Sequence, residues 1–175
     1  MTTSVRLPSI DRRRALEAVL VGGFLAGVFD GLDAVFFFGW TVGVSPGRIF
    51  QHIASGLLGP SAFHYGWYTI LLGIFLHFTI AFGAATAYYG ASILLPPLLR
   101  KPFLYGPIFG LAVYGFMYYV VVPISLVATR TKAMSRLELI NEVLVHALFV
   151  GLPIALVASR SIRVNARNEA LGSKR

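Results

Sequence analysis

The sequence predicts an all-α integral membrane protein: a four-helix bundle with an extra interfacial amphipathic helix between the first two spans. Of the 175 residues, 57% are apolar and only 13% are charged, whereas roughly a quarter of the residues in a soluble domain are charged. The mean hydropathy is +0.75. Four apolar runs each exceed the roughly 20 residues that a helix needs to cross a bilayer. Runs of this length are too long for barrel strands, so we expect every span to be helical.

The predicted spans lie within one transmembrane domain, residues 15–160, between basic tails at 1–14 and 161–175. The consecutive arginines at 12–14 are typical of the start of a signal peptide. The apolar stretch that follows is too long for one and lacks a small-residue cleavage site, so we expect a retained first helix. The four spans are expected at 15–40, 67–91, 103–128 and 137–159.

The distribution of positive charge predicts the orientation. Eleven of the 15 Lys and Arg residues lie in the two tails and in the loop between the second and third spans, and four lie in the other two loops. The positive-inside rule then predicts that both termini are cytoplasmic. The net charge of +8 belongs to residues flanking the spans, where they can contact anionic lipids. We therefore expect the lipid bilayer as a partner, and no nucleic acid.

The long first loop contains a helix signal of its own, predicted at 46–58. Ser45 and Pro46 are typical of a helix start, and Gly59 followed by Pro60 ends the segment. Its polar residues share one narrow face and its apolar residues cover the rest, which favours an interfacial helix on the outer leaflet or over the bundle. It could serve as an anchor only, or as a lid over a site between the spans. The polar face consists of Arg48, Gln51, His52 and Ser55.

Small residues spaced four apart predict close packing of helices in lipid. Two overlapping G-x-x-x-G motifs lie in the first span and one lies in the third span, and their partner could belong to the same chain or to another. Pro123 and Pro153 are expected to bend the third and fourth spans, because each removes a backbone hydrogen bond. The packing glycines are Gly23, Gly27, Gly31, Gly106 and Gly110.

Five ionisable residues inside the spans predict a buried polar layer, because such groups are costly in hydrocarbon without partners. Counted from the outer span ends, Asp30, His77 and His146 lie ten, ten and nine residues deep, or about 15 Å at the rise of an α-helix. The same depth on the third span falls near Met117 and Tyr118. We expect Asp30 to lie within hydrogen-bond or one-water reach of a histidine. The layer comprises Asp30, Asp33, His77, Glu142 and His146.

Four interpretations of this layer stay open. It could be a satisfied polar core, or a proton or ion pathway. It could bind a divalent metal through Asp30, His77, Glu142 and His146, although Glu-x-x-x-His differs from the Glu-x-x-His spacing of di-iron bundles. It could also bind haem, with His77 and His146 as axial ligands.

Enzyme signatures are weak. The sequence holds no cysteine, which excludes disulfides, thiolate catalysis and cysteine-ligated iron–sulfur clusters. Asp30-x-x-Asp33 is a single buried motif, whereas membrane prenyltransferases have a pair of aspartate-rich motifs at an aqueous face. No nucleophile elbow, zinc-protease motif or phosphate loop is present. We expect no catalytic residues, with an intramembrane metal-dependent enzyme as the alternative.

Five sequence blocks resemble a group of small uncharacterised bacterial inner-membrane proteins, which is more distantly similar to the YagU family. The likeness covers most of residues 20–158 and implies four helices in a bacterial plasma membrane. It implies no chemistry for individual residues. The blocks are AGVFDGLDA (26–34), RIFQHIASGLLG (48–59), LGIFLHFTIAF (72–82), YGFMYYVVVPIS (114–125) and VHALFVGLPIAL (145–156).

The functional expectation is a non-enzymatic multi-pass protein, acting as a small subunit in a homo-oligomer or a larger membrane complex. Its glycine stripe in the first span would pack against itself or against other membrane protein subunits. A proton, ion or small-solute carrier that uses the buried layer is the alternative. A haem- or metal-binding electron-transfer subunit is the second alternative.

Overall fold

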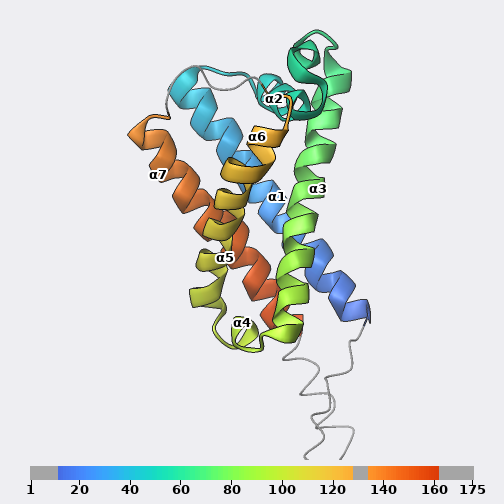
Figure 1. Cartoon of the computed structure of the whole chain (residues 1–175), viewed down its shortest axis with the longest axis vertical. Helices are drawn as coiled ribbons and strands as arrows, with labels where there is room; N and C mark the ends of the chain where they lie inside the picture. The colour runs from blue at the N-terminus through green and yellow to red at the C-terminus, as the bar shows by residue number, and fades with distance from the viewer. Residues whose placement is uncertain (1–11, 128–133, 162–175) are drawn as a thin grey trace, which may run out of the picture.

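The computed structural model describes residues 12–127 and 134–161, and every regular element in these ranges is helical. Four helices are long and apolar enough to cross a membrane (Figure 1). This confirms the predicted fold class and the multi-pass architecture. The predicted tails lie outside the described residues except at their inner edges. The four helices cover Ala15–Val42, Trp67–Leu94, Pro102–Ile124 and Arg136–Ser161.

These spans are built from named elements that also include short helical segments between them. The third span joins α5 to a π-helical turn and a short last helix. The fourth joins α7 to a second π-helical turn and continues helically to Ser161. The elements are α1 (Arg12–Val42), α2 (Pro46–Leu58), η1 (Gly59–Phe63), α3 (Trp67–Leu94), α4 (Pro97–Arg100), α5 (Pro102–Phe116), η2 (Met117–Val121), α6 (Val122–Ile124), α7 (Arg136–Val145) and η3 (His146–Gly151).

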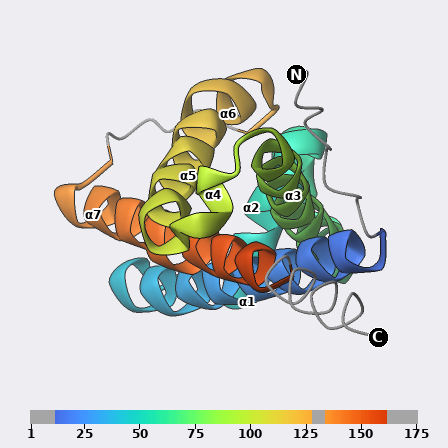
Figure 2. The same ribbon diagram turned by 90° about the horizontal axis from the view of Figure 1, so that it is seen from below.

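The four spans pack as two pairs of helices, and one helix of each pair also contacts the other pair. α1 packs along α3, α5 packs along the fourth span, and α1 also contacts the fourth span (Figure 2). α3 and α5 are consecutive along the chain, yet each packs mainly on a different helix. A ring contact between Tyr88 and Phe109, 4.9 Å between centroids, joins them. This arrangement leaves space between α3 and α5 at the level of the predicted polar layer.

The predicted packing glycines are used within the chain. Side chains of α3 fill the stripe on α1, since a Cβ at Gly23 would meet Phe82 and one at Gly27 would meet Phe78. On α5, a Cβ at Gly110 would overlap the carbonyl oxygen of His146. Gly106 likewise lies against the backbone of the fourth span near Gly151. The glycines therefore set how closely the backbones of this one chain approach.

Pro123 and Pro153, the prolines expected to bend the third and fourth spans, each follow a π-helical turn. In η2 the N–H of Val122 donates to the carbonyl of Met117, five residues earlier, just before Pro123. In η3 the N–H of Leu152 donates to Ala147 in the same way, just before Pro153. A proline ring clashes with the carbonyl four residues before it and lacks the N–H to bond it. The wider turn accommodates this clash, where the sequence predicted only a bend.

The third span ends earlier than the predicted boundary at residue 128. It stops at Ile124 because Ser125 has an extended backbone, with φ −84° and ψ 167°. The N–H of Leu126 then donates to the carbonyl of Gly56 on α2, 2.8 Å away. Residue 128 itself lies outside the described residues. The chain after the third span is thus tied to α2 instead of continuing the helix.

The helix predicted at 46–58 is confirmed, and its polar face is partly buried and partly exposed. Ser45 occupies the N-cap position without a side-chain cap bond, and Gly59 ends the helix at φ +63°. Gln51 and Ser55 are buried, and the Gln51 amide donates to the carbonyl of Gly66 at 3.1 Å. Half of the predicted polar face is therefore buried, Gln51 against groups at the start of α3, whereas Arg48 and His52 are exposed.

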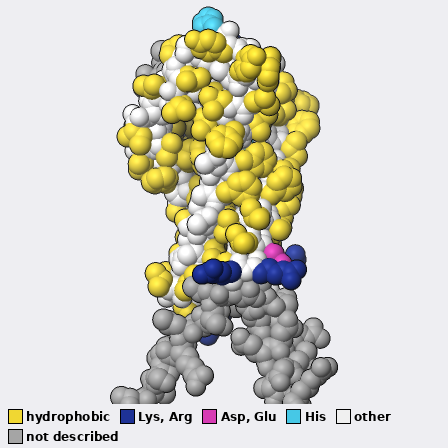
Figure 3. Space-filling model, turned by 90° about the vertical axis from the view of Figure 1, so that its right-hand side faces the viewer, with side chains coloured by type: hydrophobic (Ala, Val, Ile, Leu, Met, Phe, Trp, Pro, Cys, Tyr) yellow, Lys and Arg dark blue, Asp and Glu magenta, His cyan; other side chains and the backbone are white. Residues whose placement is uncertain are grey.

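The two ends of the bundle differ in charge. Described basic residues gather at the end where α1 begins and where α4 lies, and we call this the basic end (Figure 3). Large apolar side chains cover the sides of the spans. The opposite end, which we call the α2 end, carries Trp40 and Trp67, exposed to 92% and 59%. This is the surface of a protein that contacts lipid along its length. The basic end comprises Arg12, Arg13, Arg100, Lys101 and Arg160.

Candidate functional site

A cavity of about 680 Å³ lies between the spans, and all four spans and α2 contribute to its lining. It extends from Ala26 and Val150 near the middle of the bundle to Ser125 and Met134 toward the α2 end. All five residues of the predicted polar layer line it, as do Met117 and Tyr118 of the third span. The cavity therefore brings together residues of the polar layer that lie up to 116 positions apart in the sequence, from Asp30 to His146. Its ionisable and hydroxylated-ring lining residues include Asp30, Asp33, His52, His77, Tyr114, Glu142 and His146.

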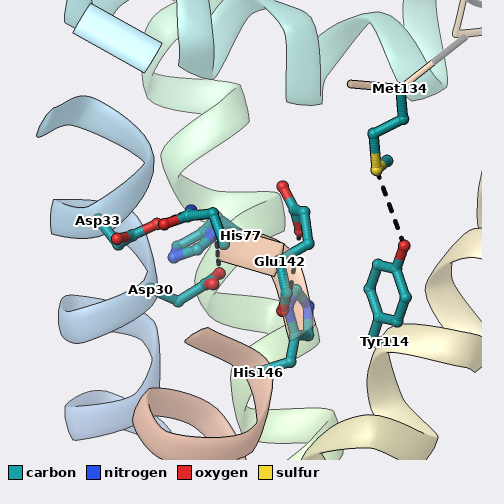
Figure 4. A network of polar contacts seen from close by, with 8 residues as sticks. Asp30, Asp33, His77, Tyr114, Met134, Glu142 and His146 are labelled. Carbon is teal, nitrogen blue, oxygen red and sulfur yellow. Dashed lines mark hydrogen bonds and ion pairs between the residues drawn. The ribbon is translucent and has the colours of Figure 1, made fainter. Parts of the chain in front are cut away.

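Asp30 of α1 and His77 of α3 face each other across the helix interface (Figure 4). The Nδ1 atom of His77 lies 4.0 Å from Oδ2 of Asp30. The Nε2 atom of the same ring lies 2.8 Å from the carbonyl oxygen of Gly27. Gly31 makes this possible, because a Cβ there would come within 3.2 Å of Nε2. The expectation that Asp30 lies within one-water reach of a histidine is met by His77.

The contact with Gly27 fixes the tautomer of His77. A carbonyl oxygen only accepts hydrogen bonds, so Nε2 must carry the proton and donate it to Gly27. In the neutral ring, Nδ1 then presents a lone pair toward the carboxylate of Asp30. Two acceptors facing each other are repulsive unless a proton or a donor lies between them. The pair is therefore built to share a proton, a water molecule or a bound donor group.

The second pair, Glu142 and His146, lies on one helix. The Nδ1 atom of His146 is 2.9 Å from the backbone carbonyl oxygen of Glu142 and 3.6 Å from its Oε2 atom. The His146 ring packs against Tyr114 with centroids 5.3 Å apart. The Tyr114 hydroxyl donates to the sulfur of Met134 at 3.9 Å. Here Nδ1 carries the proton of the neutral ring, so the two histidines have opposite tautomers.

Asp33 has a partner that is not among the five residues of the predicted layer. The Asn141 amide donates to Oδ2 of Asp33 at 2.8 Å and joins α7 to α1. Tyr114 and His52 also line the cavity without having been predicted. A depth count along α5 and the third span could have indicated Tyr114, one turn from Met117. His52 belongs to the polar face of the predicted helix at 46–58, and its place in the lining agrees with the alternative in which this helix covers a site between the spans.

The geometry does not support a shared metal or a bis-histidine haem. Within the described residues, no three His, Asp or Glu side chains are placed to hold a metal ion. The four suggested metal ligands form two separate pairs instead. For haem, the Nε2 atom of His77 is already bonded to Gly27, and its other nitrogen faces a carboxylate. Axial ligation would need this ring to give up the contact of whichever nitrogen bound the iron.

The ionisable side chains that the structure describes around the cavity are acidic residues, histidines and tyrosines. Three carboxylates line it, and no Lys or Arg occurs among the lining residues that the structure describes. Charges interact more strongly in such a low-dielectric region than in water. The arrangement can hold and exchange protons, or bind a solute that brings positive charge. Comparison with protein-family models, curated proteins and solved structures finds no match.

Proposed function

We propose that this multi-pass membrane protein is a non-enzymatic carrier of protons, ions or a small solute, and that its working site is the cavity between the spans. The observation that carries the proposal is the cavity of about 680 Å³ with three carboxylates and three imidazoles in its lining. Ionisable groups inside a membrane are retained mainly where they serve a pathway or a site. The cavity is partly open to the surface, where its lining residue Tyr119 is exposed to 75%, so a solute could enter it from outside.

The glycine stripe was the main argument for a role as a subunit of a complex, and this argument no longer applies because α3 of the same chain covers the stripe. Gly23 and Gly27 contact phenylalanine rings of α3 in the same chain. A complex with other subunits, or with a second copy, would have to use the lipid-facing sides of the spans. The carrier role needs no further partner than the bilayer, with anionic lipids at the basic end.

The charge asymmetry supports the proposed orientation. The start of α1 and the short helix α4, which ends at Arg100, lie at the same end of the bundle (Figure 1), and positive charge favours the cytoplasmic side. We place this end, with both termini, in the cytoplasm of a bacterium, at its plasma membrane. The cavity then reaches toward the outer side, where α2 covers the bundle.

Proton flux into liposomes tests this function. Purified protein is reconstituted with a pH-sensitive dye inside, and a potassium diffusion potential drives the flux. We expect flux above that of empty vesicles, and a loss of most of it in Asp30→Asn. Glu17→Gln is the matched control, since it removes a carboxylate of α1 that is exposed and paired with Arg13 outside the cavity.

A parallel experiment measures the flux of small cations, each driven by its own concentration gradient, in place of the proton flux. Flux of protons or of any small cation that depends on Asp30 supports the proposal. Wild-type vesicles that match empty vesicles for every species would contradict it. A monodisperse monomer in mild detergent would further oppose the subunit role.

A further inference from the structure

The size of the cavity indicates an organic occupant. Its volume of about 680 Å³ falls in the range of roughly 300–1,000 Å³ typical of small-molecule sites. Most of its lining is aliphatic or aromatic, from Ile53 and Ile80 on one side to Val113 and Val145 on the other. Calcium needs about six to eight oxygen ligands, and no group of three acidic or histidine side chains is placed for a metal among the described residues. The lining therefore fits a molecule that is apolar over most of its surface.

The charges of the cavity indicate the sign of that molecule. Asp30 and Asp33 enter the cavity from α1 and Glu142 enters it from α7, without a lining Lys or Arg in the described chain. One ring nitrogen of His77 and one of His146 each form a hydrogen bond with a backbone carbonyl oxygen. An anionic ligand would meet three carboxylates here. A ligand with a positive charge would instead be attracted to these carboxylates.

Aromatic rings complete the wall opposite α1. Tyr114 and Tyr118 lie 5.9 Å apart between ring centroids, and Tyr118 and Tyr119 lie 5.0 Å apart. All three line the cavity, and Tyr114 lies across it from Asp33 (Figure 4). Aromatic faces attract organic cations, and they do so more strongly where water is excluded. Carboxylates on one side and tyrosine rings on the other suit a cation with a bulky apolar body.

We infer that the cavity binds an apolar organic monocation, of the aromatic-ammonium or phosphonium class, between the carboxylates of α1 and α7 and the tyrosines of the third span. This inference rests on the proposed function and names the class of its solute. The positive centre lies near Asp30 and Glu142, and the apolar groups fill the space lined by Ile80, Val113 and Val121.

Direct binding to purified protein in detergent tests the ligand class. The probes are radiolabelled tetraphenylphosphonium and benzyltrimethylammonium, measured by equilibrium dialysis. Neopentylbenzene is the neutral control, because it replaces the ammonium nitrogen of benzyltrimethylammonium by carbon at nearly the same shape. We expect saturable binding of both cations. Loss of one charged partner in Asp30→Asn or Glu142→Gln should weaken this binding about tenfold.

Matched variants locate the site and control for folding. Glu17→Gln should bind like the wild type, and Asp30→Glu should keep most of the affinity because it keeps the charge. Circular dichroism and gel filtration report whether each variant folds. If Asp30→Asn fails to fold, Glu142→Gln on a different helix carries the test.

Three results would overturn the inference. The neutral analogue could bind as tightly as the cation, both carboxylate variants could bind like the wild type, or neither cation could bind saturably. If no cation binds while proton flux in liposomes still depends on Asp30, the ligand class is wrong and the carrier function stands. If both assays fail, both proposals are wrong.

Discussion

The two carboxylate–imidazole pairs of the cavity are chemically alike but structurally different. Asp30 and His77 come from different helices and meet only when α1 packs on α3, with 4.0 Å between the nearest atoms. Glu142 and His146 are four residues apart on one helix. Any helix brings residues at this spacing together. The first pair is therefore a product of tertiary packing, and the second is a product of local structure.

This difference decides what each pair depends on. Both ring nitrogens of His77 contact groups of another helix. Nε2 contacts the carbonyl of Gly27, and Nδ1 lies near the carboxylate of Asp30. His146 keeps a backbone carbonyl of its own helix as its partner. Disturbing the packing should therefore reorganise the first pair, whereas the second pair should keep its main hydrogen bond. The predictions below use this contrast, in order of decreasing effect.

The largest effect is expected from Gly110→Ala, which pushes α5 away from the helix that carries the second pair. Its added methyl group would overlap the carbonyl oxygen of His146. Backbone atoms cannot move aside as a side-chain end can, so we expect a loss of about 3 kcal/mol in unfolding free energy. Thermal unfolding in detergent measures it.

Gly115→Ala on the same span is the control, because a Cβ there meets nothing within 4 Å. It should leave the stability unchanged or raise it by up to about 1 kcal/mol through helix propensity. Equal destabilisation by both variants would show that the close contact at His146 has no special weight.

The next effect separates the two pairs directly. Asp30→Leu removes the side-chain partner of His77 Nδ1 and should destabilise the protein by about 2 kcal/mol, the cost of an unsatisfied buried polar group. Glu142→Leu should destabilise it by clearly less, since residue 142 still supplies its backbone carbonyl to His146. Asp30→Asn should retain much of the lost stability. Thermal unfolding in the same detergent compares the three variants, and an equal loss for both leucine variants would contradict the contrast.

A smaller effect is expected from Gly31→Ala. A Cβ at this position comes within 3.2 Å of His77 Nε2, so the ring must shift by a few tenths of an ångström. We expect a destabilisation of about 1 kcal/mol or less, together with a weaker His77–Gly27 hydrogen bond. Gly83→Ala, with nothing within 4 Å, is the matched control. Nitrogen-15 spectra of labelled histidine would detect the change at His77, and unchanged His77 resonances would contradict it.

The last test measures the tautomers of His77 and His146, and it expects no difference in stability. With both rings neutral, His77 should carry its proton on Nε2 and His146 on Nδ1, because each of these atoms faces a backbone carbonyl. Long-range proton–nitrogen correlation spectra distinguish the two forms, and His77→Gln and His146→Gln variants assign the signals. The same tautomer at both positions would show that at least one carbonyl contact is absent.

The sequence predicted how deep the polar residues lie along the spans, but it did not predict which side chains contact each other. Helical rise is fixed, so counting residues placed Asp30 and His77 at one level, and they meet. The glycine stripe indicated close packing without indicating its partner, because small residues fit any helix. The inward orientation of Gln51 could not be predicted, since it depends on Gly66 and Thr69 across a turn. Asn141 reaches Asp33 only because α7 lies beside α1.

The π-helical turns before Pro123 and Pro153 each act as a one-residue insertion in the helical register. An α-helix turns by about 100° per residue, so one extra residue rotates everything beyond it by that angle. His146 stands at the start of η3, and Val150 and Gly151 stand at its end. A helical wheel drawn through the whole span therefore misassigns the faces of one half. The same span can aim His146 at the cavity and still present Gly151 to α5, which a continuous α-helix with this sequence would not do.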